Sequence, residues 1–191
     1  MNKDKQMTTK QEFMRKALGF DDGPGSGQDQ FSPKAPVSVP RIAPFADWDY
    51  YYLLSPIGWE PEGDAVGRFA PVEAPRGFVT DLASIPRVLW PIMPPTSRYT
   101  HAAIIHDFHY WTQTISRSDA DEILSIGMGE LNVPGWTTFA VYNAVKLAGG
   151  SAWDNNARLK EQGESRFLRK LPKEPTITWE DWKSRGGVLL T

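Results

Sequence analysis

Three histidines are the residues of this chain best suited to handle protons, and they lie within nine positions, at His101, His106 and His109. His106 is followed by Asp107 and, one helical turn later, by Tyr110, all within an apolar run. A histidine beside a carboxylate can act as a general base or bind a metal ion. The segment around His106 is therefore the first candidate for a functional site.

A second acid, from a later segment, is predicted to approach His106. Residues 100–112 and 118–131 have the apolar spacing of two helices, and the short link between them favours antiparallel packing. Successive side chains of a helix are about 100° apart. By this phasing Tyr110 shares a face with His106, and Asp121 lies at the edge of the apolar face of the second helix. We therefore expect Asp121 to face His106.

Two interpretations of these residues are open. In the first, Asp121 fixes the tautomer of His106, whose other nitrogen becomes a base for water. Asp107 is then left to bind a hard cation such as calcium, which would polarise a carbonyl group. In the second, His106, Asp107, Tyr110 and Asp121 form a buried hydrogen-bond network that only holds the two helices together.

The other two histidines, His101 and His109, carry less weight in both interpretations. We expect both of them at the surface or the rim of the domain. A zinc site built from His106, His109 and one acid is a weaker alternative, because the segment offers no third strong ligand.

A second polar motif precedes the first helix, at residues 77–87. Thr80, Asp81 and Ser84 suit a junction between a strand and a helix, where short polar side chains bond to nearby backbone groups. Ser84 lacks the flanking glycines of a serine nucleophile. Asp81 is a candidate cation ligand beside Asp107. Two arginines are candidates to receive an anion or to pair with these acids: Arg87 and Arg98.

The elements that must position these residues indicate an α+β fold. Aromatic and apolar runs predict short strands at residues 50–54, 65–70 and 77–80. A third helix is predicted over residues 136–148, apolar on almost every side and ended by the glycine pair at 149–150. We expect a small antiparallel sheet packed on a three-helix core, with an extended N-terminal arm and a C-terminal tail.

The core domain is predicted to span residues 47–153. Residues 1–46 are predicted to be an arm and linker, in which a short amphipathic stripe is suited to docking on a partner and recurring prolines keep the chain extended. Residues 154–191 are predicted to be a C-terminal extension with a basic cluster. Its aromatic segment, Trp179–Trp182, either folds back on the core or reaches a partner.

Composition excludes several classes of protein. The formal net charge of -2 over 191 residues argues against a general nucleic-acid-binding protein. The absence of cysteine excludes a disulfide scaffold and thiolate metal ligands. No apolar run approaches the roughly 20 residues of a membrane span, and the polar N-terminus does not resemble a signal peptide. The eight tryptophans suggest large buried anchors or an interface.

Three ordered motifs together resemble an uncharacterised family of phage and prophage proteins. They are Gly-Phe-x-Thr-Asp-x-Ala-Ser-Ile-Pro-Arg at 77–87, a segment ending in His-Asp-x-x-Tyr at 98–110, and Arg-x-x-Ala-Asp at 117–121. The resemblance covers roughly residues 48–153. It implies a phage context, with the protein in the virion or the host cytoplasm, and brings no established activity.

The His-Asp-x-x-Tyr helix followed by a helix with Ala-Asp is also similar to the phospholipase A2 superfamily, including forms carried in some viral capsid proteins. That likeness implies that His106 is the base, Asp107 a calcium ligand, Asp121 the partner of His106 and Tyr110 a support for Asp121. The same helix looks like that of metal-dependent phosphohydrolases. That class also needs a histidine well upstream, and the chain has none before His101.

The leading hypothesis is therefore a phage-encoded, virion-associated accessory protein that hydrolyses an ester, with membrane lipid of the host envelope as the substrate. The competing hypothesis is a non-enzymatic head, neck or tail protein whose N-terminal arm and aromatic tail bind neighbouring virion subunits. A third is a small phage effector that acts on a host component. No specific nucleic-acid partner is expected.

Overall fold

The computed structural model describes residues 40–82 and 99–190 of the chain. The amphipathic stripe predicted near the N-terminus lies outside the described residues. So do three residues of the polar motifs: Ser84, Arg87 and Arg98.

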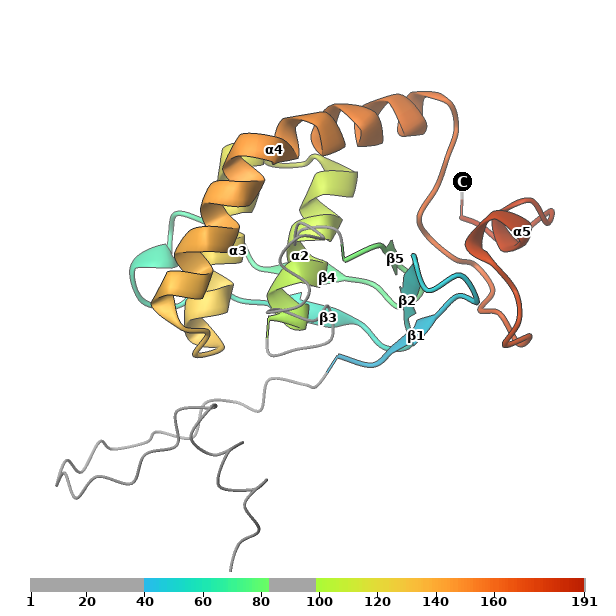
Figure 1. The fold of residues 1–191 in the computed structure, drawn as a ribbon, viewed down its shortest axis with the longest axis horizontal. Coiled ribbons are helices and arrows are strands. Elements are labelled where there is room, and N and C mark those ends of the chain that lie inside the picture. Colours follow the sequence, from blue (N-terminus) through green and yellow to red (C-terminus); the bar gives the residue numbers. More distant parts are fainter. Residues whose placement is uncertain (1–39, 83–98, 191) are drawn as a thin grey trace, which may run out of the picture. The chain divides into compact units, whose positions relative to one another are not determined.

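Two small antiparallel sheets precede the helices (Figure 1). The first has the order β1-β2-β5 and contains strands β1 (Ile42–Pro44), β2 (Tyr51–Leu53) and β5 (Val79–Thr80). The second pairs β3 (Ile57–Trp59) with β4 (Val72–Ala74). A single 3-10 turn, η1 (Gly63–Ala65), lies between β3 and β4.

Three main helices follow, and they confirm the predicted α+β class. They are α2 (Thr100–Thr112), α3 (Arg117–Glu130) and α4 (Gly135–Glu161). The Ser116 side chain caps α3 by accepting the backbone N–H of Asp119. Helix α2 ends where Gln113 adopts a left-handed conformation, with φ of 56°. A short helix, α5 (Trp179–Lys183), lies near the C-terminus (Figure 1).

Two predicted elements are wrong. Residues 65–70 do not form a strand, because Gly67 turns the chain at φ of 80° and leaves only an isolated bridge between Val66 and Phe69. The glycine pair at 149–150 does not end the third helix, which continues to Glu161. A Cβ atom on Gly149 would lie 2.3 Å from the hydroxyl oxygen of Tyr110, so this glycine serves close packing rather than termination.

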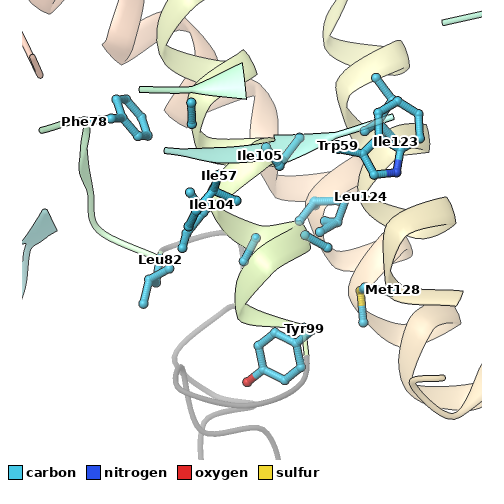
Figure 2. Close-up of a cluster of buried hydrophobic side chains, with 14 of the residues drawn as sticks. Ile57, Trp59, Phe78, Leu82, Tyr99, Ile104, Ile105, Ile123, Leu124 and Met128 are labelled. Carbon is cyan, nitrogen blue, oxygen red and sulfur yellow. The ribbon is translucent and has the colours of Figure 1, made fainter. Parts of the chain in front are cut away.

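The main core lies between the sheets and the helices. Figure 2 shows Ile57 and Trp59 of β3 together with Ile104 and Ile105 of α2 and with the α3 residues Ile123, Leu124 and Met128. Helix α2 contacts β3, β4, β5, α3 and α4, so it has no solvent face. These elements also surround His101 and His109, and both side chains are buried. The prediction that these two histidines lie at the surface or the rim is therefore wrong.

The C-terminal aromatic segment folds back on the first sheet rather than extending away from the core. Trp179 is fully buried against Phe45 and Tyr50, in a second apolar cluster that also contains Val79 of β5. Phe45 therefore belongs to a core, although it falls within the predicted linker. Among the described residues, no helix is both long and apolar enough to cross a membrane.

Candidate functional site

Helices α2 and α3 bring His106, Tyr110 and Asp121 together, in the arrangement that the helical phasing predicts. The Nε2 atom of His106 lies 2.9 Å from Oδ1 of Asp121. The Tyr110 hydroxyl donates to the same oxygen over 2.6 Å. All three side chains are buried, so water competes little for these bonds.

Arg117 holds the other side of the Asp121 carboxylate. Its Nη1 atom lies 3.3 Å from Oδ2 of Asp121, one turn further along the same helix. The same nitrogen donates to the backbone oxygens of Val145 and Lys146 in α4, at 3.5 Å and 3.3 Å. Three donors thus converge on one acid. The i,i+4 spacing in the Arg-x-x-Ala-Asp motif was the sequence signal for this contact.

These bonds define the protonation state of His106. A carboxylate only accepts hydrogen bonds, so the proton of the neutral imidazole lies on Nε2 and the lone pair on Nδ1. Burial lowers the pKa of His106, and the hydrogen bond and charge of Asp121 oppose this shift. The pKa of Tyr110 is raised, first by burial and then by Asp121, so its hydroxyl stays a donor.

Helix α4 fixes the position of Tyr110 from the far side. The ring of Trp153 meets the Tyr110 ring edge-on, with centroids 5.2 Å apart. The Asn156 side chain donates to the backbone oxygen of Tyr110 over 3.2 Å. Together with the close approach at Gly149, these contacts leave little room for the phenol to move.

Asp107 is positioned by the end of strand β5. The Thr80 hydroxyl donates to Oδ2 of Asp107 and accepts the backbone N–H of Leu82 over 3.1 Å. The other oxygen of Asp107 lies 4.0 Å from Nδ1 of His106. Thr80 therefore makes the local backbone contact that its motif predicts, and it also bonds to α2, which the sequence did not reveal.

Arg166 is a functional candidate that the sequence analysis missed. Its Nη1 atom lies 3.4 Å from Oδ2 of Asp81, and its backbone oxygen accepts the N–H of Val79. The guanidinium is buried between the rings of Tyr50 and Trp111, 5.5 Å and 5.0 Å from their centroids. Its Nε finds no acceptor among the described residues. In the sequence Arg166 belonged only to a basic cluster in the predicted tail.

Several of the polar side chains described above face one cavity of about 310 Å³. His106, Asp107, Asp81 and Arg166 all line it. The opposite wall is one face of helix α4, and it is mostly apolar: Ala144, Val145, Ala148, Ala152 and Leu159. The cavity thus offers a histidine held by a buried acid, the carboxylates of Asp81 and Asp107, one guanidinium that faces Asp81, and an apolar surface.

Calcium binding by Asp107 and Asp81 stays a prediction. Calcium takes about six to eight oxygen ligands. Within residues 40–82 and 99–190, no cluster of three or more histidine, aspartate or glutamate side chains is placed to hold a metal ion. Asp81 already faces the guanidinium of Arg166, and Asp107 the hydroxyl of Thr80.

Comparison with known proteins gives one family match and one relative. Residues 64–145 match a family model described as a protein of unknown function, DUF1353. The uncharacterised protein y4jT of Sinorhizobium fredii (strain NBRC 101917 / NGR234) is 36% identical over 115 residues, which are 56% of this chain. The chain spans 34% of the length of that relative. No solved structure matches the chain significantly.

The match divides the residues of the candidate site into two groups. His106, Asp107, Tyr110 and Asp121 lie within the stretch that matches the family model, whereas Arg166 lies beyond its end. Neither description names an activity or a phage origin. The comparisons therefore relate residues 64–145 of this chain, including the histidine and its acid, to the DUF1353 family of unknown function.

Proposed function

We propose that the cavity is the active site of an ester hydrolase in which His106 is the general base. The observation that carries the proposal is the dyad of His106 and Asp121, with His106 on the wall of a cavity of about 310 Å³. A histidine held in one tautomer by a buried acid is the usual arrangement for activating a nucleophile. Its lowered pKa keeps His106 neutral, and so able to accept a proton, at neutral pH.

The chemistry would follow from these positions. Nδ1 of His106 removes a proton from water as the water oxygen bonds to the ester carbonyl carbon. The resulting tetrahedral oxyanion collapses, the bond from carbon to the alkoxy oxygen breaks, and His106 returns its proton to the leaving oxygen. The products are a carboxylic acid and an alcohol. Asp121 stabilises the transient imidazolium, and Tyr110 and Arg117 keep Asp121 in place.

The cavity walls suggest the class of ester. The apolar face of α4 suits a hydrocarbon chain. The guanidinium of Arg166 would exchange its contact with Asp81 for a negative charge on the substrate or on the oxyanion. The unpartnered Nε of Arg166 is a further donor for such an oxygen. An ester that has both an apolar chain and an anionic group fits this combination. An anionic phospholipid of a host membrane is such an ester, and it is the class of substrate that the sequence resemblance would imply.

A comparison of two histidine variants tests the proposal. Release of fatty acid from phosphatidylglycerol vesicles is measured for the full chain, with calcium and with a chelator. We expect His106→Gln to lower the rate by about 10²-fold or more, since a general base contributes about 10²–10⁴-fold. His101→Gln is the matched control, because His101 is buried on the same helix but does not line the cavity. Equal rates for His106→Gln and the wild type would refute the proposal.

A second candidate function is that of a structural subunit of a phage particle. The observation in its favour is an exposed apolar surface on α4: Trp136, Phe139 and Leu147 are 65%, 71% and 87% exposed. Helical spacing puts these side chains on one face, opposite the wall of the cavity. Exposed aromatic side chains that share a face are typical of protein interfaces.

Incorporation into particles tests the second candidate. Particles are assembled with the wild type, with the double variant Phe139→Asp/Leu147→Asp, or with His106→Gln. We expect the double variant to be absent from purified particles and His106→Gln to be present at the wild-type level. Particles that contain the double variant at the wild-type level would contradict a structural role for this face.

A further inference from the structure

A second hollow, separate from the cavity of His106, gathers most of the unpaired positive charge of the C-terminal region. We call it the basic groove. It has a volume of about 600 Å³ and is lined by five cationic side chains: Arg76, Arg169, Lys170, Lys173 and Arg185. Among the described residues that line it, the only acid is Glu174. The groove concentrates positive charge on a chain whose formal net charge is -2.

Most of this charge is not balanced by the protein. Glu174 is occupied by Arg185, whose two terminal nitrogens lie 2.8 Å and 2.9 Å from its carboxylate oxygens. Arg76, Arg169, Lys170 and Lys173 form no ion pair with any acid in the described part of the chain. Like charges repel one another when they are held together. The groove therefore favours an anion that spans several of these side chains.

Backbone contacts bring together the chain segments that contain these cations. Gly77 adopts φ of 86°, and a Cβ atom there would lie 2.7 Å from the backbone oxygen of Leu168. This close approach sets Arg76 beside the segment that contains Arg169 and Lys170. The backbone N–H groups of both Arg169 and Lys170 donate to the oxygen of Val188, over 2.8 Å and 3.2 Å.

A buried donor without an acceptor lies in the same wall. Trp182 lines the groove and is only 7% exposed, and its Nε1–H has no hydrogen-bond acceptor in the described structure. A buried donor left without an acceptor is costly, so such groups in native proteins call for an explanation. The N–H is itself enclosed by the protein, so an oxygen of a bound anion would supply the missing acceptor once the Trp182 side chain turns toward the groove.

We propose that the basic groove is a binding site for a compact polyanion that has two or more phosphate groups, such as a nucleoside polyphosphate or an inorganic polyphosphate. The volume lies within the usual range for sites of small ligands, about 300–1,000 Å³. The concave shape and the buried indole favour a small ligand over a flat membrane surface. The negative net charge of the chain disfavours nucleic acid. The site is independent of the proposed hydrolase activity.

Calorimetric titration with tripolyphosphate tests the proposal on the full chain. The groove variant is Arg169→Gln/Lys170→Gln/Lys173→Gln. The control variant, Arg41→Gln/Lys146→Gln/Arg158→Gln, removes the same charge from residues that do not line the groove. We expect the groove variant to bind about tenfold or more weakly, and the control to stay within about twofold of the wild type, because contact with a cation outweighs long-range attraction. Trp182→Phe should weaken binding about threefold or more, since it removes only one donor.

Several results would overturn the proposal. Equal weakening in the groove and control variants would mean that net charge alone attracts the ligand. Unchanged binding in Trp182→Phe would refute the proposed contact between the anion and the indole N–H, and binding unchanged in the groove variant as well would refute the site itself. Vesicles of phosphatidylglycerol and a DNA duplex form two further arms of the experiment. If either binds through the groove while tripolyphosphate and ATP do not, the partner is a membrane or a nucleic acid rather than a compact polyanion.

Discussion

Replacing Gly149 with alanine is expected to destabilise the protein, although alanine ordinarily stabilises the interior of a helix. The new Cβ would lie 2.3 Å from the hydroxyl oxygen of Tyr110 and 3.3 Å from its Cζ. The first distance is shorter than any real contact of a Cβ atom. The Tyr110 oxygen cannot simply move away, because it is bonded to Asp121 at 2.6 Å and its ring packs on Trp153.

The magnitude follows from three contributions to the free energy of unfolding. Alanine in place of glycine gains about 1 kcal/mol of helix propensity. Overpacking costs about 1–3 kcal/mol. Loss of the hydrogen bond between Tyr110 and the charged Asp121 costs about 1.5–3 kcal/mol, if the phenol is forced out. We therefore expect Gly149→Ala to lower the stability by about 1.5–5 kcal/mol.

Two comparisons isolate the contact. Gly150→Ala is the matched control, since a Cβ there meets nothing within 4 Å, and it should stabilise the protein by about 0.5–1 kcal/mol. In a Tyr110→Phe background the closest atom becomes Cζ at 3.3 Å, a contact that a small shift relieves. Gly149→Ala should then cost almost nothing. The double-mutant cycle is expected to give a coupling of about 1.5–5 kcal/mol.

Urea unfolding followed by circular dichroism measures all four variants. The reasoning would be refuted if Gly149→Ala were as stable as Gly150→Ala. It would also be refuted if Gly149→Ala cost as much in the Tyr110→Phe background as in the wild type. Either result would mean that α4 does not hold Tyr110 against Asp121.

Three further predictions concern the charged groups. Asp121→Asn should lower the rate of ester hydrolysis by about 10²-fold or more with little change in fold, because an amide can hold the wrong tautomer of His106; an unchanged initial rate would count against the dyad. Arg166→Gln should slow hydrolysis of phosphatidylglycerol more than of phosphatidylcholine, since it removes a cation from the cavity; equal slowing would argue against recognition of charge. Burial lowers the pKa of His109 from 6.5 to about 4, so the unfolded chain takes up a proton at this residue first as the pH falls. Protonation of His109 should account for about 2 kcal/mol of the stability lost between pH 7 and pH 5, and His109→Leu should remove that part of the loss in urea titrations at the two pH values.

The contacts that could be predicted are those set by local helical geometry. His106, Tyr110 and Asp121 lie on two consecutive helices joined by a short link, so phasing and antiparallel packing were enough to bring them together. Their hydrogen bonds follow from that placement. The α+β class was predictable because three segments have helical patterns and the runs at 50–54 and 77–80 have the composition of strands, which β2 and β5 confirm. Strands β1, β3 and β4 were not predicted.

The contacts that escaped prediction depend on segments far apart in the chain. Arg166 meets Asp81 across 85 positions, and nothing local distinguishes it from the neighbouring basic residues. His109 was expected at the surface because phasing assumes one exposed face, whereas sheets and helices surround α2 on all sides. Gly149 resembles a helix terminator in the sequence, and only its distance from Tyr110 reveals its role. Long-range packing overrides local propensity in each case.

The single guanidinium of Arg117 has a mechanical consequence for the cavity. One nitrogen contacts both the acid that orients His106 and two backbone oxygens of α4, the helix that forms the apolar wall. A ligand large enough to push α4 outward would stretch these contacts and would thereby disturb Asp121. The size of the bound ligand and the orientation of His106 are thus linked through the side chain of Arg117. We therefore expect the cavity to favour ligands that fit between His106 and α4 without displacing this helix.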